Sequence, residues 1–128
     1  MLRTSLIALT LAALATAALA QGKTPYTAEE MKVLLAKGLT VAGSDPKGGA
    51  EFTSEVTLHP DGKLTGKINI PGQDAFPIDG SWILNGSQVC RTLSKTQPVE
   101  VCEIWLKTGP KEATIVVNGK ESAINRWK

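Results

Sequence analysis

Residues 80–106 contain the side chains of this chain with the most chemistry to offer. The segment holds both cysteines, two of the three tryptophans and the charged residues Arg91 and Glu103. An arginine beside a glutamate among tryptophans suits a small pocket, in which the guanidinium group holds a carboxylate or a phosphate. We therefore take Arg91, Glu103, Trp82 and Trp105 as candidate ligand-binding residues. Two structural alternatives stand beside this one: a salt bridge near an open end of the fold, or a bulge that reverses the face.

The two cysteines, Cys90 and Cys102, are the only ones in the chain. An even pair in an exported protein is most simply a disulfide. A redox site is the alternative, but the pair lacks the C-x-x-C spacing and an evident base. A zinc site would need more cysteine or histidine ligands nearby. We therefore predict a structural disulfide and no metal site.

The remaining reactive side chains form no catalytic set. His59 precedes a Pro-Asp-Gly turn and has no serine and aspartate in triad spacing. Glu51 and Glu55 lie on the solvent-facing side of an alternating segment. They are more typical of a solvated surface than of a catalytic pair of carboxylates. The glycines at 48–49 are not followed by the Gly-Lys-Ser/Thr of a phosphate loop. The sequence therefore points to no catalytic residue and no cofactor.

Residues 1–20 have the pattern of a secretory signal peptide. A single basic residue, Arg3, precedes an apolar run that ends in Ala18-Leu19-Ala20, a small-x-small cleavage site. The run is short for a membrane span, although an N-terminal anchor is the alternative. We expect a periplasmic or secreted protein with no transmembrane segment after cleavage.

Cleavage would leave residues 21–128, with 13 basic and 12 acidic side chains, since Arg3 is the one charge removed. That length fits one domain with a modest core. The near-neutral chain has no basic stripe with interleaved aromatics, so nucleic acid is a poor candidate partner. The partner expected instead is a small ligand or another protein.

A short helix is predicted at residues 28–37. Thr27 and Glu30 have the spacing of a capping box, and Tyr26 and Met31 that of a hydrophobic staple. Gly38 suits the position that ends a helix. A helix this short needs another element to pack against.

From residue 39 the hydrophobic period changes to two, which is typical of strands with one buried and one solvated face. Gly66 falls on the inward side, where it lets a strand bend or a neighbour approach. The pattern predicts a mainly β, antiparallel fold of seven or eight strands, a small barrel or a sandwich, with the helix plugging or flanking it. The predicted strands are residues 39–43, 51–59, 63–70, 78–84, 87–93, 99–107, 113–117 and 120–127.

Two turns predict which side chains share a face within residues 80–106. If Asn85-Gly86 forms a two-residue loop, Leu84 faces Ser87 and Trp82 faces Val89. A five-residue loop at 94–98 would pair Cys90 with Cys102, Arg91 with Val101 and Leu93 with Val99. The disulfide then lies on the face opposite the tryptophans. The inward face would carry Trp82, Leu84, Val89, Arg91, Leu93, Val99, Val101, Glu103 and Trp105.

The order of these features resembles that of small exported proteobacterial proteins of unassigned function. The shared pattern is a signal peptide, a short helix (TAEEMKVLLAKGLTVAG), then D-G-x-x-x-G, G-x-W and a cysteine pair. Asp61, Gly62 and Gly66 match the first motif, and Gly80 and Trp82 match the second. The resemblance covers most of the mature chain and implies a compact β-fold with no particular activity.

The function expected from these features is that of an exported, non-enzymatic binding or interaction module of the cell envelope. A secreted inhibitor that presents a loop, at 94–98 or 44–49, is the alternative. A small envelope enzyme that uses Arg91, Glu103 or His59 is a third. A ligand binder predicts a cavity containing Arg91, an inhibitor a solid core with a protruding loop, and an enzyme converging titratable groups.

Overall fold

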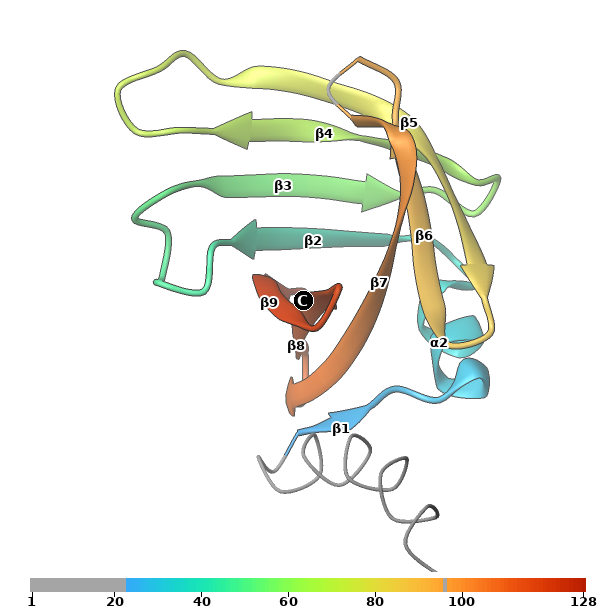
Figure 1. Cartoon of the computed structure of the whole chain (residues 1–128). Helices are drawn as coiled ribbons and strands as arrows, with labels where there is room; N and C mark the ends of the chain where they lie inside the picture. The colour runs from blue at the N-terminus through green and yellow to red at the C-terminus, as the bar shows by residue number, and fades with distance from the viewer. Residues whose placement is uncertain (1–22, 96) are drawn as a thin grey trace, which may run out of the picture.

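The fold is an antiparallel β-barrel with one short helix (Figure 1). The computed structural model describes residues 23–95 and 97–128, so the predicted signal peptide lies outside the described residues. Strands β2 to β9 follow one another around the barrel in chain order, and β9 returns to pair with β2. The elements are β1 (Thr24–Pro25), α2 (Ala28–Leu35), β2 (Leu39–Ser44), β3 (Thr53–Leu58), β4 (Lys63–Asn69), β5 (Phe76–Asn85), β6 (Gln88–Leu93), β7 (Gln97–Gly109), β8 (Glu112–Val117) and β9 (Lys120–Arg126).

The prediction of a mainly β fold with a short N-terminal helix is confirmed, and the sheet closes as a barrel. One strand, β1, was not predicted, because two residues that include a proline carry no alternating pattern. It pairs with Leu106 and Lys107 of β7, along the edge of β7 that does not pair with β8.

Strand β7 is 13 residues long and is shared between two neighbours. Its residues 97–103 pair with β6, and its residues 104–109 pair with β8. Strand β7 therefore connects the part of the barrel wall formed by β6 to the part formed by β8, as Figure 1 shows.

Helix α2 plugs one end of the barrel. The Thr27 hydroxyl accepts from the backbone N–H of Glu30 at 3.1 Å, and the Glu30 carboxylate accepts from the N–H of Thr27 at 3.0 Å, so the capping box is confirmed. The helix ends at Leu35 and not at residue 37, and Gly38 turns the chain into β2 with φ of +80°. Met31 and Leu35 are fully buried in the same cluster as core residues of the barrel. This packing supplies the support that so short a helix needs.

Two glycines let the sheet bend tightly enough to close. A Cβ atom on Gly66 would lie 2.1 Å from the carbonyl oxygen of Glu55, and one on Gly80 would lie 1.9 Å from that of Thr92. The strand backbones therefore approach more closely than any side chain allows. In Figure 1, β5 runs beside β4 and then turns to run beside β6. The inward, close-approach role predicted for Gly66 is confirmed, and Gly80 has the same role.

A buried aspartate organises the loop between β2 and β3. The Asp45 side chain is inaccessible to solvent and accepts hydrogen bonds from the backbone N–H groups of Lys47 (2.7 Å), Glu51 (2.8 Å) and Phe52 (3.1 Å). Burial by itself raises the pKa of Asp45, but these donors hold the pKa below its ordinary value of 3.8. The carboxylate thus fixes the loop that leads into β3.

We expect Gly80→Ala to lower the free energy of unfolding by about 3 kcal/mol, because the new methyl group meets the backbone of β6. The matched control is Gly109→Ala, whose Cβ would meet only the side chain of Glu112, at 3.2 Å. The free energy of unfolding of this control should fall by less than about 1 kcal/mol, as for most substitutions away from tightly packed sites. Urea unfolding measures both, and equal losses would contradict the close approach at Gly80.

Acid should destabilise the fold through Asp45 and Glu30. A hydrogen bond from Lys107, followed by one from the backbone of Thr27, holds the pKa of Glu30 below its ordinary value of 4.5. Because both folded pKa values are depressed, both carboxylates stabilise the fold above their ordinary pKa values. That contribution is lost as the pH falls through the folded values. The urea midpoint of the wild-type protein should therefore fall between about pH 6 and about pH 3.

Asp45→Asn tests the share of this acid sensitivity that comes from the loop. The variant should be less stable than wild type near neutral pH and should lose less stability on acidification. Asp74→Asn, at an exposed position between β4 and β5, is the matched control and should retain the wild-type profile. An Asp45→Asn variant as acid-sensitive as wild type would contradict the role given to this carboxylate.

Candidate functional site

Arg91 and Glu103 form an ion pair on the inner face of the barrel. The pairing of Val89 with Glu103 and of Arg91 with Val101 makes the two charged residues diagonal neighbours on β6 and β7. The Arg91 Nε donates to Glu103 Oε2 at 2.9 Å, and the two side chains are 22% and 11% exposed. The other carboxylate oxygen, Oε1, accepts from the indole N–H of Trp105 at 3.4 Å. Glu103 is therefore held from two sides.

The register of the β5–β6 hairpin differs from the prediction by two residues. Leu84 pairs with Val89, and Trp82 pairs with Arg91, because the loop consists of Gly86 and Ser87 and not of Asn85 and Gly86. Only the first of these two loop residues has a positive φ, at +62°, which is typical of a type II′ turn. A shift of two residues returns each side chain to the same face, so the predicted inward face survives the wrong register.

A second correction concerns the far end of the β6–β7 pair. Cys90 pairs with Cys102, as predicted, but Leu93 pairs with Gln97 and not with Val99. An irregularity between Arg91 and Leu93 causes the shift, because the single residue between them on β6 lies opposite three residues of β7, 98–100, so that β7 carries two extra residues. Val99, predicted to point inward, is 73% exposed. The irregularity follows Arg91 along the strand, so it does not reverse the face of the ion pair.

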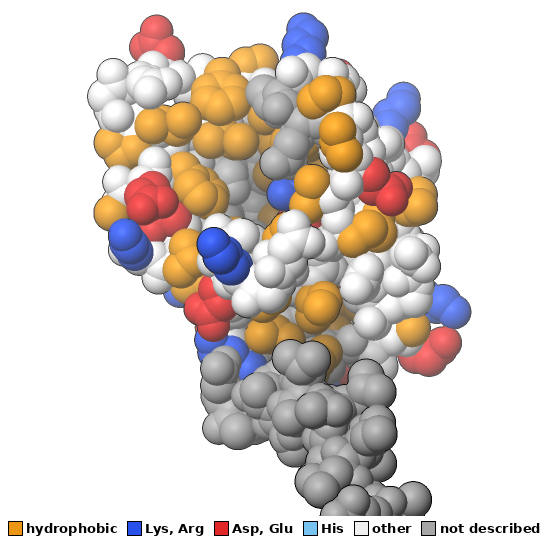
Figure 2. All heavy atoms as spheres, in the orientation of Figure 1, with side chains coloured by type: hydrophobic (Ala, Val, Ile, Leu, Met, Phe, Trp, Pro, Cys, Tyr) orange, Lys and Arg blue, Asp and Glu red, His pale blue; other side chains and the backbone are white. Residues whose placement is uncertain are grey.

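The ion pair lines a cavity of about 340 Å³ inside the barrel. That volume lies at the lower end of the range of small-molecule sites. Figure 2 shows the surface hollowed on this side, with hydrophobic side chains around the hollow and a basic side chain visible within it. The lining side chains are mostly apolar and come from seven strands and the loop before β3: Val41, Phe52, Ser54, Val56, Leu58, Leu64, Ile68, Phe76, Ile78, Val89, Arg91, Leu93, Glu103, Trp105, Ser122, Ala123 and Asn125.

Two clusters of buried side chains bound this cavity. The larger one joins Met31 and Leu35 of α2 to residues of the barrel, including Val89 and Trp105, which also line the cavity. The smaller one, Leu64, Ile78 and Leu93, forms part of the wall. The cavity is therefore closed by the helical plug at the end where the larger cluster lies.

Trp82 is the one predicted site residue that does not line the cavity. It lies on the inward face and packs against both clusters, and its indole N–H donates to the carbonyl oxygen of His59 at 2.9 Å. Trp82 thus joins the two clusters within the barrel wall. Arg91, Glu103 and Trp105, in contrast, all line the cavity.

Three polar residues of the lining were not singled out from the sequence. Ser54 follows the alternation of β3, which placed Phe52 and Val56 on the inner face, so its position was readable. The inward position of Ser122 could not be predicted from alternation, because a bulge in β9 at this point presents two successive residues to the cavity. Asn125 pairs with Gly43, which in turn pairs with Ser54, so these polar groups meet where β9 closes against β2.

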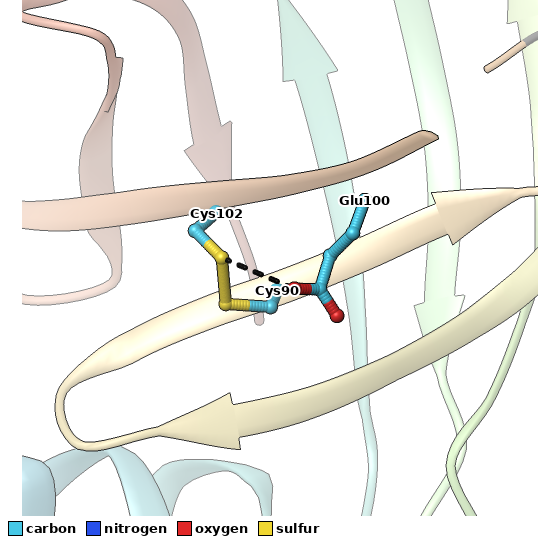
Figure 3. A group of neighbouring side chains, drawn as sticks. All are labelled: Cys90, Glu100 and Cys102. Atoms are coloured by element: carbon cyan, nitrogen blue, oxygen red, sulfur yellow. Dashed lines mark hydrogen bonds between the residues drawn. A yellow bond between two sulfur atoms is a disulfide. The ribbon is translucent and has the colours of Figure 1, made fainter. Parts of the chain in front are cut away.

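The disulfide joins Cys90 of β6 to Cys102 of β7 (Figure 3). Because neighbouring residues of a strand point to opposite faces, it lies on the face opposite Arg91 and Glu103. The predicted opposition of disulfide and tryptophans is thus confirmed for Trp105, which lies on the cavity side. The carboxylate of Glu100 lies 3.8 Å from Cys102 Sγ. These three side chains have metal-ligand geometry, but two sulfur atoms bonded to each other offer no thiolate to a metal.

His59 and Glu55, for which the sequence indicates no catalytic role, lie on the surface of the sheet, and the C-terminal residues complete it. The His59 ring contacts the Thr65 hydroxyl at 2.7 Å, on the exposed outer side of β4. Glu55 pairs across β3 and β4 with Lys67. Arg126 closes the barrel against β2, and Trp127 packs its ring 6.0 Å from that of Trp105. The C-terminal residues therefore complete the sheet.

Comparisons of the chain with protein-family models, with curated proteins and with solved structures found no match. The resemblance to small exported proteobacterial proteins stays a prediction from the sequence. Within residues 23–95 and 97–128, no helix has the length and apolar character needed to cross a membrane.

Removing the disulfide should lower stability without changing the cavity. We expect the double variant Cys90→Ser, Cys102→Ser to lose about 3 kcal/mol of unfolding free energy, because the bond constrains the unfolded chain. Reductant should lower the urea midpoint of the wild-type protein and leave that of the double variant unchanged. Two free thiols in the wild-type protein purified without reductant, found by mass spectrometry, would contradict the assignment.

Proposed function

We propose that this protein is an exported, non-enzymatic binding protein that holds a small, mainly apolar ligand inside its barrel. The observation that carries the proposal is the cavity of about 340 Å³. Its wall combines many apolar side chains with a few polar groups, among them Arg91 and Glu103. Apolar walls that supply affinity and a few placed polar groups that supply orientation are the usual composition of small-molecule sites.

Two features support export. The Cys90–Cys102 disulfide is of a kind that forms and persists in oxidising compartments. The sequence of residues 1–20 independently predicts a signal peptide. A periplasmic or secreted location fits both.

The cavity favours binding over catalysis. Its described lining contains two charged side chains, Arg91 and Glu103, and these engage each other. An enzyme site needs a titratable group placed to exchange a proton or attack a substrate. Here the carboxylate is fixed by the guanidinium group and by the indole of Trp105, an arrangement that suits fixed recognition better than proton transfer.

A secreted inhibitor remains the second candidate, and one observation favours it. Val99, just after the β6–β7 loop, is 73% exposed, and an exposed apolar residue beside a hairpin loop suits contact with another protein. The hollow interior, however, is not the solid core expected of a rigid inhibitor.

Filling the cavity tests the proposal. Ile68→Trp should reduce binding of the neutral fluorescent probe N-phenyl-naphthylamine at least about tenfold, because the indole occupies the space lined by Ile68. Lys67→Trp is the matched control, since the adjacent residue of β4 is exposed on the outer face. Fluorescence titration measures binding, and urea unfolding checks that both variants fold. Equal probe binding by the two variants would place the ligand outside the barrel and contradict the proposal.

A further inference from the structure

The cavity wall carries two opposite charges and no others among its described residues. Arg91 and Glu103 are the ionisable members of the lining, and their direct contact of 2.9 Å cancels their charges locally. The remaining polar members, Ser54, Ser122 and Asn125, are uncharged. The interior therefore presents hydrogen-bonding groups without a net charge.

Glu103 is also the obstacle to an anionic ligand. A ligand carboxylate that approached Arg91 would compete with the carboxylate of Glu103. The Glu103 side chain is only 11% exposed, so it has little room to move aside. Trp105 holds its second oxygen at 3.4 Å, which further fixes the carboxylate in place. Two carboxylates beside one guanidinium group would leave a negative charge unpaired in a poorly solvated site, which is strongly unfavourable. A cationic ligand would meet the corresponding penalty from Arg91.

We infer, on the basis of the function proposed above, that the cavity selects an uncharged ligand and that Glu103 is the residue that excludes carboxylates. The ligand is an apolar chain or ring with a neutral hydrogen-bonding group, such as a hydroxyl. A hydroxyl donates to a carboxylate and accepts from a guanidinium group, so it suits the edge of an intact ion pair. A volume of about 340 Å³ lies at the lower end of the range of small-molecule sites, so the ligand is small.

Three molecules of nearly equal size separate the charge classes: decanol, nonanoate and decylamine. Each competes with N-phenyl-naphthylamine for the wild-type protein near neutral pH. We expect decanol to displace the probe at a concentration at least about tenfold lower than either charged molecule, in line with the penalty for an unpaired charge. Nonanoate that competes as well as decanol would overturn the inference and leave the proposed function standing. A wild-type protein that takes up neither the probe nor any of the three would contradict the proposed function itself.

Glu103→Gln isolates the residue responsible. Glutamine keeps an oxygen that accepts from Trp105 but removes the charge that neutralises Arg91, so nonanoate should gain at least about tenfold relative to decanol. Glu100→Gln, on the exposed outer face of the same strand, is the matched control and should keep the preference for decanol. A Glu103→Gln variant that folds and still rejects nonanoate would overturn the role of Glu103. If that variant does not fold, competition by the three molecules with the wild-type protein still shows whether the ligand is neutral or charged. The variant Arg91→Met then tests the role of the ion pair, because the unpaired Glu103 carboxylate should make decylamine the strongest competitor.

Discussion

The structure depends on the closure of the sheet, and three residue pairs between β2 and β9 complete it. At the middle of this junction stands Gly43, paired with Ser54 on one side and Asn125 on the other. A Cβ atom there would lie 2.4 Å from the Ser54 hydroxyl, so the glycine makes room for the polar side chains of both neighbours. Trp127, next after β9, packs against Trp105 and Tyr26 and holds the closing strand in place. Without this junction the strands would form an open sheet with exposed edges and no enclosed volume.

Closure determines what polarity the interior can contain. A charge inside a poorly solvated volume is tolerated when an opposite charge and hydrogen-bond donors accompany it. Arg91, Glu103 and Trp105 meet this requirement together, across two adjacent strands. Helix α2 closes one end of the barrel, and the glycines allow the strands to curve around the cavity. The pair provides polarity without net charge.

Much of this fold was predictable because it follows local rules. Alternating side chains identified the strands and placed Arg91, Glu103 and Trp105 together on the face opposite the cysteines. The predicted five-residue loop at 94–98 gave the correct pairing of Cys90 with Cys102, although the actual loop is two residues shorter and two extra residues in β7 make up the difference. The chain departs from prediction where extra residues are inserted into a strand or where a turn shifts. Asn118 and Gly119 both adopt positive φ and form the β8–β9 turn, whereas Gly86 takes the first central position of its own turn. The same dipeptide thus gives different registers, and sequence alternation does not distinguish them. The bulges in β6–β7 and β9, the polar junction at Asn125 and the volume of the cavity all depend on contacts between distant strands.

The division of β7 between two partners has a consequence for the behaviour of the protein in crowded solution. Among the described residues, 97–103 pair with β6 along one edge and with no strand along the other. A free edge of this kind is a template on which a second molecule can add a strand. Pro98 lacks a backbone N–H for such pairing, and Glu103 places an inward-pointing charge at the end of the same stretch. Both devices discourage association between edges. The carboxylate that balances the interior thus also helps to keep one molecule from joining its sheet to the next.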